Sequence, residues 1–185
     1  MKKSVKTAFI YIIVFAGIFA LNSCGGQKKP VRSIVEKNGT LYINGSDKPF
    51  TGKEKAKVNN RIIEYQVVDG KKNGIFKISY LNGNPQMIGQ MRDNKNEGLW
   101  RYFYMDSTLE SQGHFKDDFP DGEWLWYYPD GRLKDKGNYL KGISQGTWKD
   151  YDPKGNIVSE TFYKDGKKIK VKDYKKHKRK NTTGG

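Results

Sequence analysis

The residue types that carry most enzyme chemistry are sparse in this chain. Its 185 residues include two histidines, His114 and His177, and one cysteine. A general base needs a positioned partner and a cleft around it, and neither histidine has a nucleophile or carboxylate that recurs beside it. The sequence also lacks a Gly-rich phosphate loop, a Ser–His–Asp order and paired metal ligands. We therefore expect no catalytic site and no cofactor.

One cluster of acids could suggest a cation site. Asp117, Asp118, Asp121 and Glu123 lie close together in the sequence. Calcium loops place oxygen ligands at alternate positions with a fixed glycine and a closing glutamate, and that spacing is missing here. The stretch Phe119-Pro120-Asp121-Gly122 instead has the composition of a turn between hairpins. We therefore expect no metal site in this cluster.

The N-terminus has the pattern of an export signal. A basic stretch, MKKSVK, precedes fourteen uncharged residues from Ala8 to Leu21. A membrane-spanning helix needs about 20 apolar residues, so residues 1–23 instead fit a secretory signal peptide. The junction Leu21-Asn22-Ser23-Cys24 resembles the lipobox of bacterial lipoproteins, where the cysteine is lipidated and becomes the first mature residue. A plain signal peptide with an incidental cysteine is the alternative.

The location of the mature protein follows from this lipobox resemblance. Lipidation of Cys24, the only cysteine, would exclude both disulfides and cysteine catalysis. A run of acids after the cysteine, which some lipoproteins use for surface export, is replaced by Gly25-Gly26-Gln27-Lys28-Lys29. We expect a lipid-anchored protein of the bacterial cell envelope on the periplasmic face of the outer membrane. Residues 24–33 would form the lipidated N-terminus and a linker.

The C-terminus is strongly basic, and residues 170–185 are expected to form a tail. Ten basic and two acidic residues lie between Lys164 and Lys180, in a chain of net charge +15. The tail could be a solvated, disordered end, or it could bind anionic lipid or lipopolysaccharide at about 1 kcal/mol per basic residue. Nucleic acid ranks last, because exported proteins seldom meet it and only Tyr174 interleaves with the charges. The candidate basic residues are Lys167, Lys168, Lys170, Lys172, Lys175, Lys176, Lys178, Arg179 and Lys180.

The body of the chain is repetitive, with a Gly-x-aromatic motif every 24 residues. The starting glycines are Gly74, Gly98, Gly122 and Gly146. Fifteen residues after each come Gly89, Gly113, Gly137 and Thr161. A fixed period of this length signals a repeat architecture. We expect a repeat domain over residues 50–169, with a degenerate copy before the first glycine and an edge hairpin over residues 34–49 that turns at Asn38-Gly39.

Each repeat predicts a β-hairpin. Aromatic and β-branched residues flank glycine-bearing turn signals, which favour two-residue type I′ turns. These turn signals are Asn82-Gly83, Asp130-Gly131 and Lys154-Gly155. The stretch from Met105 to Thr108 lacks the glycine and predicts another turn type.

The expected register places aromatic residues opposite glycines. With Asp130-Gly131 at the tip, Trp124 faces Gly137, Gly122 faces Tyr139, and Tyr128 faces Leu133 on the same side of the sheet. The preceding copy sets Trp100 against Gly113 in the same way. A ring can lie over the bare backbone of a cross-strand glycine and shield it.

The pattern G-x-W-x-x-Y-Y-x-x-G-x-L, followed by glycine and an aromatic, resembles the bacterial variant of the MORN repeat (membrane occupation and recognition nexus). The resemblance covers about Phe50 to Lys168. Together with the hairpin pattern it implies an all-β protein, an elongated single-layer antiparallel sheet of tandem hairpins. Similar bacterial proteins are often described as antitoxin components, which implies an antitoxin-like or immunity role against an exported toxin as one alternative function.

We expect a membrane-anchored binding or scaffold protein that recognises a protein of the cell envelope. Repeat sheets present long surfaces, aromatic residues dominate interface energetics, and a single layer offers no deep pocket for an enzyme. Shielding of glycines is an equally open role for the rings, and binding of anionic lipid or lipopolysaccharide through the tail is a further alternative. The candidate partner-binding aromatics are Phe76, Trp100, Trp124, Tyr128, Tyr139 and Trp148.

Overall fold

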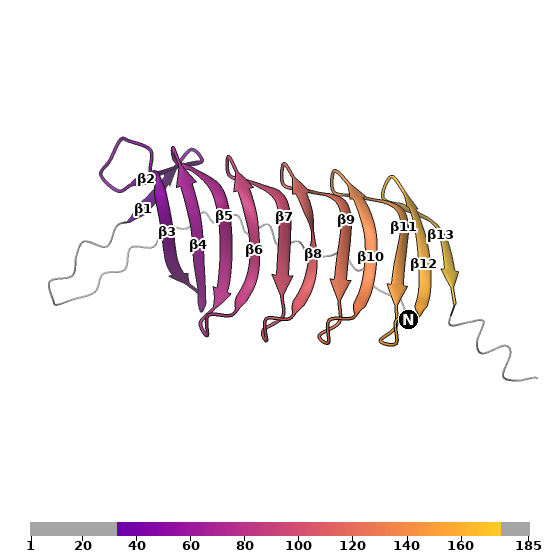
Figure 1. Cartoon of the computed structure of the whole chain (residues 1–185). Coiled ribbons are helices and arrows are strands. Elements are labelled where there is room, and N and C mark those ends of the chain that lie inside the picture. Colours follow the sequence, from indigo (N-terminus) through magenta and orange to yellow (C-terminus); the bar gives the residue numbers. More distant parts are fainter. Residues whose placement is uncertain (1–32, 175–185) are drawn as a thin grey trace, which may run out of the picture.

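The computed structural model describes residues 33–174, which form strands and turns (Figure 1). Cys24 and the basic residues from Lys175 to Lys180 lie outside this range. The strands are β1 Ile34–Lys37, β2 Thr40–Ile43, β3 Gly52–Val58, β4 Arg61–Val68, β5 Lys71–Tyr80, β6 Pro85–Arg92, β7 Lys95–Phe103, β8 Leu109–Lys116, β9 Phe119–Tyr127, β10 Leu133–Leu140, β11 Ile143–Tyr151, β12 Ile157–Lys164 and β13 Lys167–Asp173.

Strands β3 to β13 form one long antiparallel sheet in which every strand pairs with its neighbours in the sequence. Figure 1 shows them side by side in chain order, from the indigo end to the yellow end. The all-β architecture predicted from the repeat is therefore confirmed. No helix within residues 33–174 is long and apolar enough to cross a membrane.

Two-residue turns join successive repeats along the upper margin in Figure 1. Asp117-Asp118 between β8 and β9 has φ values of 50° and 71°, and Lys141-Gly142 between β10 and β11 has 48° and 80°. Positive φ at both central residues defines the type I′ turn. The stretch Phe119 to Gly122, expected to be a turn, is instead the beginning of β9. Aspartate tolerates the left-handed conformation, so Asp117-Asp118 makes the turn two residues earlier.

At the opposite margin, the turns within the four hairpins from β5 to β12 contain three residues rather than the predicted two. The hairpin of β3 and β4 differs, because Val58 pairs with Arg61 across the two-residue turn Asn59-Asn60. The amide of Gly131 donates to the carbonyl of Tyr128 at 2.8 Å, and the amide of Tyr128 donates to the carbonyl of Arg132 at 2.8 Å. This is a type I turn followed by one left-handed residue. Ser107 takes that left-handed position, with a φ of 73°, in the loop that lacks glycine. The expectation of another turn type there was wrong.

A β-bulge at each repeat boundary explains the glycine that starts each repeat. Between β6 and β7, Ile88 pairs with Arg101 and Gln90 pairs with Glu97. An advance of two residues along β6 is therefore matched by an advance of four residues along β7, which contains the bulge. A bulge of this kind places one residue in the left-handed region, which glycine adopts without strain. The starting glycines have φ values of 101°, 67°, 83° and 66° for Gly74, Gly98, Gly122 and Gly146 respectively.

The N-terminal hairpin forms as predicted, with Asn38-Gly39 at its turn, but it does not extend the main sheet. Strands β1 and β2 make a separate two-stranded sheet, and the edge of the main sheet is β3. Leu41 of the hairpin is buried with Phe50 and Val67, and its amide donates to the carbonyl of Gly70 at 2.7 Å. The hairpin therefore caps the first repeat instead of adding a strand to it.

The sheet ends later than expected at the C-terminus. Strand β13 runs through Asp173, beyond the predicted boundary at residue 169. Lys170 stands 24 residues after Gly146, in the place of the bulge glycine, and the irregularity between β12 and β13 is one residue smaller than at the other boundaries. The residues Lys167, Lys168, Lys170 and Lys172 therefore belong to the last strand and not to a disordered tail.

Gly122 offers a direct test of the bulge. Its φ is 83°, and an added Cβ would have no neighbour within 4 Å. Changing Gly122→Ala should therefore lower the free energy of unfolding by about 1–2 kcal/mol through backbone strain alone. Gly122→Asn should recover part of that loss, because asparagine tolerates this conformation. Equal stability of all three proteins in urea unfolding would contradict the assignment.

Candidate binding surfaces

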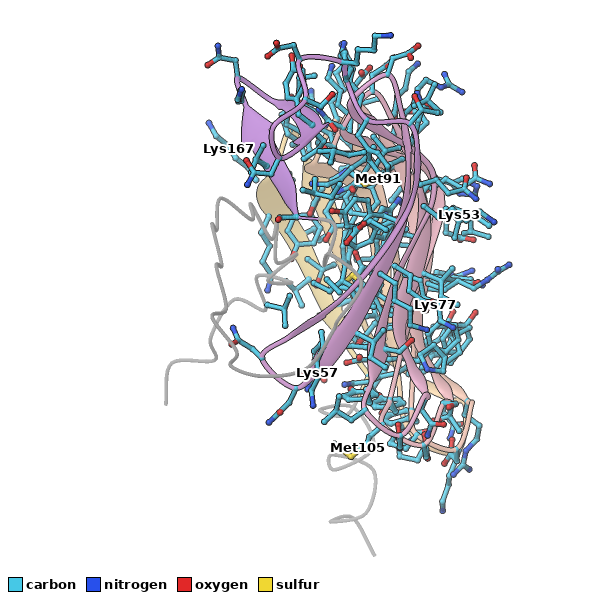
Figure 2. The ribbon with its side chains drawn as sticks, turned by 90° about the vertical axis from the view of Figure 1, so that its left-hand side faces the viewer. Lys53, Lys57, Lys77, Met91, Met105 and Lys167 are labelled. Carbon is cyan, nitrogen blue, oxygen red and sulfur yellow. The ribbon has the colours of Figure 1, made fainter. Side chains whose placement is uncertain are left out.

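The sheet has two chemically different faces. The aromatic face carries the tryptophans of the repeats with Met87 and Met91. The polar face carries Lys77, Arg101 and Lys136, which belong to one continuous cross-strand row. Figure 2 shows Met91 on one side of the ribbon and Lys53 and Lys77 on the other. Alternation of side chains along each strand produces this division.

The rings of the aromatic face form a continuous series of contacts, which we call the aromatic ladder. Centroid separations between successive members lie between 5.0 and 6.3 Å, within the range of favourable ring pairs. Most contacts around the tryptophans are edge-on, as between Phe115 and Trp124 at 5.2 Å and 88°. The ladder runs through Tyr65, Phe76, Trp100, Phe115, Trp124, Tyr139, Trp148 and Tyr163.

The predicted pairing of tryptophan with glycine is confirmed, with Trp124 opposite Gly137 and Trp100 opposite Gly113. However, each ring covers a different glycine from the one expected. A Cβ on Gly113 would overlap the indole of Trp124, and a Cβ on Gly137 would overlap that of Trp148. The bulge directs the indole toward the strand of the preceding repeat. Shielding therefore connects neighbouring repeats rather than the two strands of one hairpin.

The same bulge supplies a hydrogen-bond acceptor for the indole. The Nε1–H of Trp100 donates to the carbonyl of Gln90 at 3.0 Å, and that of Trp124 donates to the carbonyl of His114 at 3.1 Å. A buried indole N–H without a partner is costly, so this bond fixes the ring orientation. The Nε1–H of Trp148 has no partner within residues 33–174. The side chain of His114 is exposed, and only its backbone takes part.

The ladder buries part of the predicted binding surface. Trp100 and Trp124 are only 3% and 2% exposed, so they form a core, whereas Phe76, Tyr139 and Trp148 are half-buried. Burial raises the pKa of Tyr139 to about 12 and raises that of Tyr102 further. Both hydroxyls therefore stay protonated at neutral pH. A partner on this face would contact the half-buried rings.

Tyr128 does not lie on the ladder. Leu133 pairs with Tyr127 rather than Tyr128, because the three-residue turn shifts the register near the tip. The hydroxyl of Tyr128 donates to the carbonyl of Tyr151 in the next repeat at 2.8 Å. Tyr104 makes the equivalent bond to the carbonyl of Tyr127. These bonds connect the loops of neighbouring repeats at the lower margin in Figure 1.

Sequence reasoning did not include five ring positions of the aromatic face among the candidate site residues. Tyr65 and Tyr163 lie at the two ends of the ladder. Phe115 is only 2% exposed and lies between Trp100 and Trp124. Tyr102 and Trp126 are half-buried and flank Trp124 at 6.2 and 6.0 Å. Both stand two residues after a repeat tryptophan, and alternation along a strand is the signal that could have identified them.

Some of the charged side chains are paired across the surface. Asp117 accepts from Lys95 at 2.9 Å, and this hydrogen bond is the main cause that lowers the pKa of Asp117. Asp118 accepts from the amide of Asn96 at 2.7 Å. Within residues 33–174, no group of three or more His, Cys, Asp or Glu side chains is placed to hold a metal ion.

Comparison with known proteins gives one family similarity. Residues 120–141 and 144–175 match the family model described as the MORN repeat variant, which corresponds to the region of β9 to β13. No curated protein matches the chain significantly. A crystal structure of the GtfA/B complex bound to UDP and GlcNAc matches with a TM-score of 0.31 and 8% identity, covering 85% of this chain and 30% of that one.

A double-mutant cycle tests which glycine each ring covers. Trp124→Ala should cost about 3–5 kcal/mol of stability, and Gly113→Ala should also destabilise, because its Cβ overlaps the indole. In the double variant the added methyl group occupies vacated space, so we expect a coupling energy of about 1 kcal/mol or more. The pair Trp124→Ala with Gly137→Ala is the control and should couple less. Stronger coupling to Gly137 would refute shielding between repeats.

Proposed function

We propose that this chain is a membrane-anchored binding scaffold that recognises a protein of the bacterial cell envelope. The observation that carries the proposal is the set of half-buried rings, Phe76, Tyr102, Tyr139 and Trp148, beside the buried Trp100 and Trp124. Phe76, Tyr139 and Trp148 belong to the ladder, and Tyr102 packs against its member Trp124, so the set is held in place and crosses several strands. Rigid aromatic side chains provide large contact area at low entropic cost.

The chemistry of the described residues supports binding over catalysis. His114 is exposed, and its side chain makes no hydrogen bond within residues 33–174. The raised pKa values of Tyr102 and Tyr139 have burial on the packed face as their first cause. A catalytic site brings a nucleophile, a base and an orienting group together, and the described surface presents aromatic rings and dispersed charges instead.

The membrane anchor is the first testable part of this proposal. Lipidation of Cys24 would hold the protein on a membrane, because each buried CH₂ of an acyl chain contributes about 0.8 kcal/mol. Cys24→Ala should therefore give unprocessed or soluble protein in cell fractionation, while Ser23→Ala should fractionate normally. A Cys24→Ala protein that still appears as a mature membrane protein would exclude the anchor.

Binding of the partner through the aromatic face and binding through the basic tail would respond differently to mutation and to salt. Crosslinking in intact cells, followed by purification on this protein, should identify a partner. Tyr139→Ala should weaken its binding at every salt concentration, Tyr139→Phe should not, and truncation after Tyr174 should leave binding intact. Thermal unfolding must accompany the alanine variant, since Tyr139 contacts Trp148 at 5.0 Å.

The opposite pattern of mutational effects would identify the basic tail as the binding site. Loss of binding only on truncation, and only at low salt, would indicate long-range attraction, because the Debye length falls from about 30 Å at 0.01 M to about 8 Å at 0.15 M salt. A captured protein with toxin activity that this chain neutralises would instead establish the immunity alternative implied by the family similarity.

A further inference from the structure

Three large apolar side chains are exposed on the polar face around the Lys141-Gly142 turn, and we call them the turn patch. Phe119, Leu140 and Ile143 are 54%, 55% and 47% exposed. Leu140 and Ile143 are direct cross-strand partners. Phe119 Cδ1 lies 3.3 Å from the position that a Cβ of Gly142 would occupy, so all three border the same turn. They lie on the face opposite to the aromatic ladder.

The fold does not require apolar residues at these positions. Lys71, Lys95 and Lys167 occupy the places equivalent to Phe119 and Ile143 at the other repeat boundaries. Arg92 and Lys164 occupy places equivalent to Leu140. These basic residues form the same strands and turns. Exposed apolar clusters bordered by polar residues mark interaction sites more often than single exposed side chains do.

The border of the turn patch is basic. Lys116 lies directly opposite Phe119, Lys141 is in the turn, and Lys164 ends the neighbouring strand β12. None of these lysines forms an ion pair within residues 33–174.

The carboxylates of the adjacent turns already have partners. Asp117 pairs with Lys95 at 2.9 Å, Asp118 accepts from the amide of Asn96, and Asp165 accepts from the side chain of Gln145 at 3.0 Å. The lysines bordering the patch are therefore available to carboxylates from outside the sheet.

We propose that the turn patch is a second docking surface, which binds an acidic protein by its apolar side chains and surrounds the contact with lysine–carboxylate pairs. An apolar centre with a charged rim is the usual anatomy of a protein interface. Attraction to a soluble polyanion would need the lysines alone and not the exposed Phe119, Leu140 and Ile143. An anionic lipid surface attracts apolar and basic side chains together, so the crosslinking experiment must separate lipid from protein. With the aromatic face, this surface would let one sheet hold two proteins on opposite sides.

The experiment uses the full-length protein with a photo-crosslinking residue at Leu140 in cells that express it naturally. The crosslinked protein is identified, purified and titrated against the wild-type chain and two variants. Phe119→Lys with Ile143→Lys installs the residue found in equivalent copies, so the sheet should stay folded. Val68→Lys with Ile75→Lys is the matched control, since these side chains are 47% and 53% exposed on the same face of β4 and β5.

We expect the patch variant to weaken binding about tenfold or more, as loss of interface anchors does, and the control variant to bind like the wild type. Added salt should also weaken binding, because the rim contributes charge attraction. Equal binding by the patch variant, equal loss in the control, or crosslinking to lipid alone would overturn the proposal. Each variant's thermal unfolding is recorded, and Tyr139→Ala, on the other face, should leave this interaction unchanged.

Discussion

The stacking of each repeat tryptophan on a glycine of the preceding repeat is the contact on which this sheet depends. The ring of Trp124 occupies the space where a side chain at Gly113 would stand, and its N–H donates to the carbonyl of His114, the next residue. Glycine alone is unfavourable in a strand because it has no side chain to pack. Here the absence of a side chain allows the indole to approach the backbone. A glycine position that would weaken an isolated strand therefore contributes to the closely packed contact with the tryptophan.

This contact also explains how a single layer can bury side chains without a second layer above it. Trp100, Phe115 and Trp124 are almost completely inaccessible, and the side chains packed against them include the rings of Phe76 and Tyr139 and the thioether of Met91. The core is therefore a line of rings and not a volume between two sheets. Within residues 33–174 the opposite face carries no equivalent covering, which leaves its lysines and its apolar side chains such as Phe119 exposed.

Much of this arrangement follows from the sequence, because a fixed period and strand alternation determine which residues share a face. The hairpins, the pairing of Trp124 with Gly137 and the central registers were predictable in this way. The turn types were not. Type I′ turns form at Asp117-Asp118 without glycine, and Ser107 adopts a conformation for which glycine is the usual choice. The bulge at Gly122 was also missed, since a repeated glycine can indicate a bulge, a turn or a shielded position. Because the bulge decides the direction of the indole, the covered glycine was assigned to the wrong repeat.

The position of the bulge has a consequence for how such a chain can change in length. The glycine in the second strand of each 24-residue unit is covered by the tryptophan of the unit after it, and the tryptophan of each unit covers the glycine of the unit before it. An in-frame duplication between Gly98 and Gly122 would therefore recreate both interfaces with residues that already fit them. The ends differ, because Phe50 and Leu41 close the first unit and Lys170 interrupts the glycine series at the last. Growth by duplication is thus accommodated inside the array, whereas the first and last units lack one of these two interfaces.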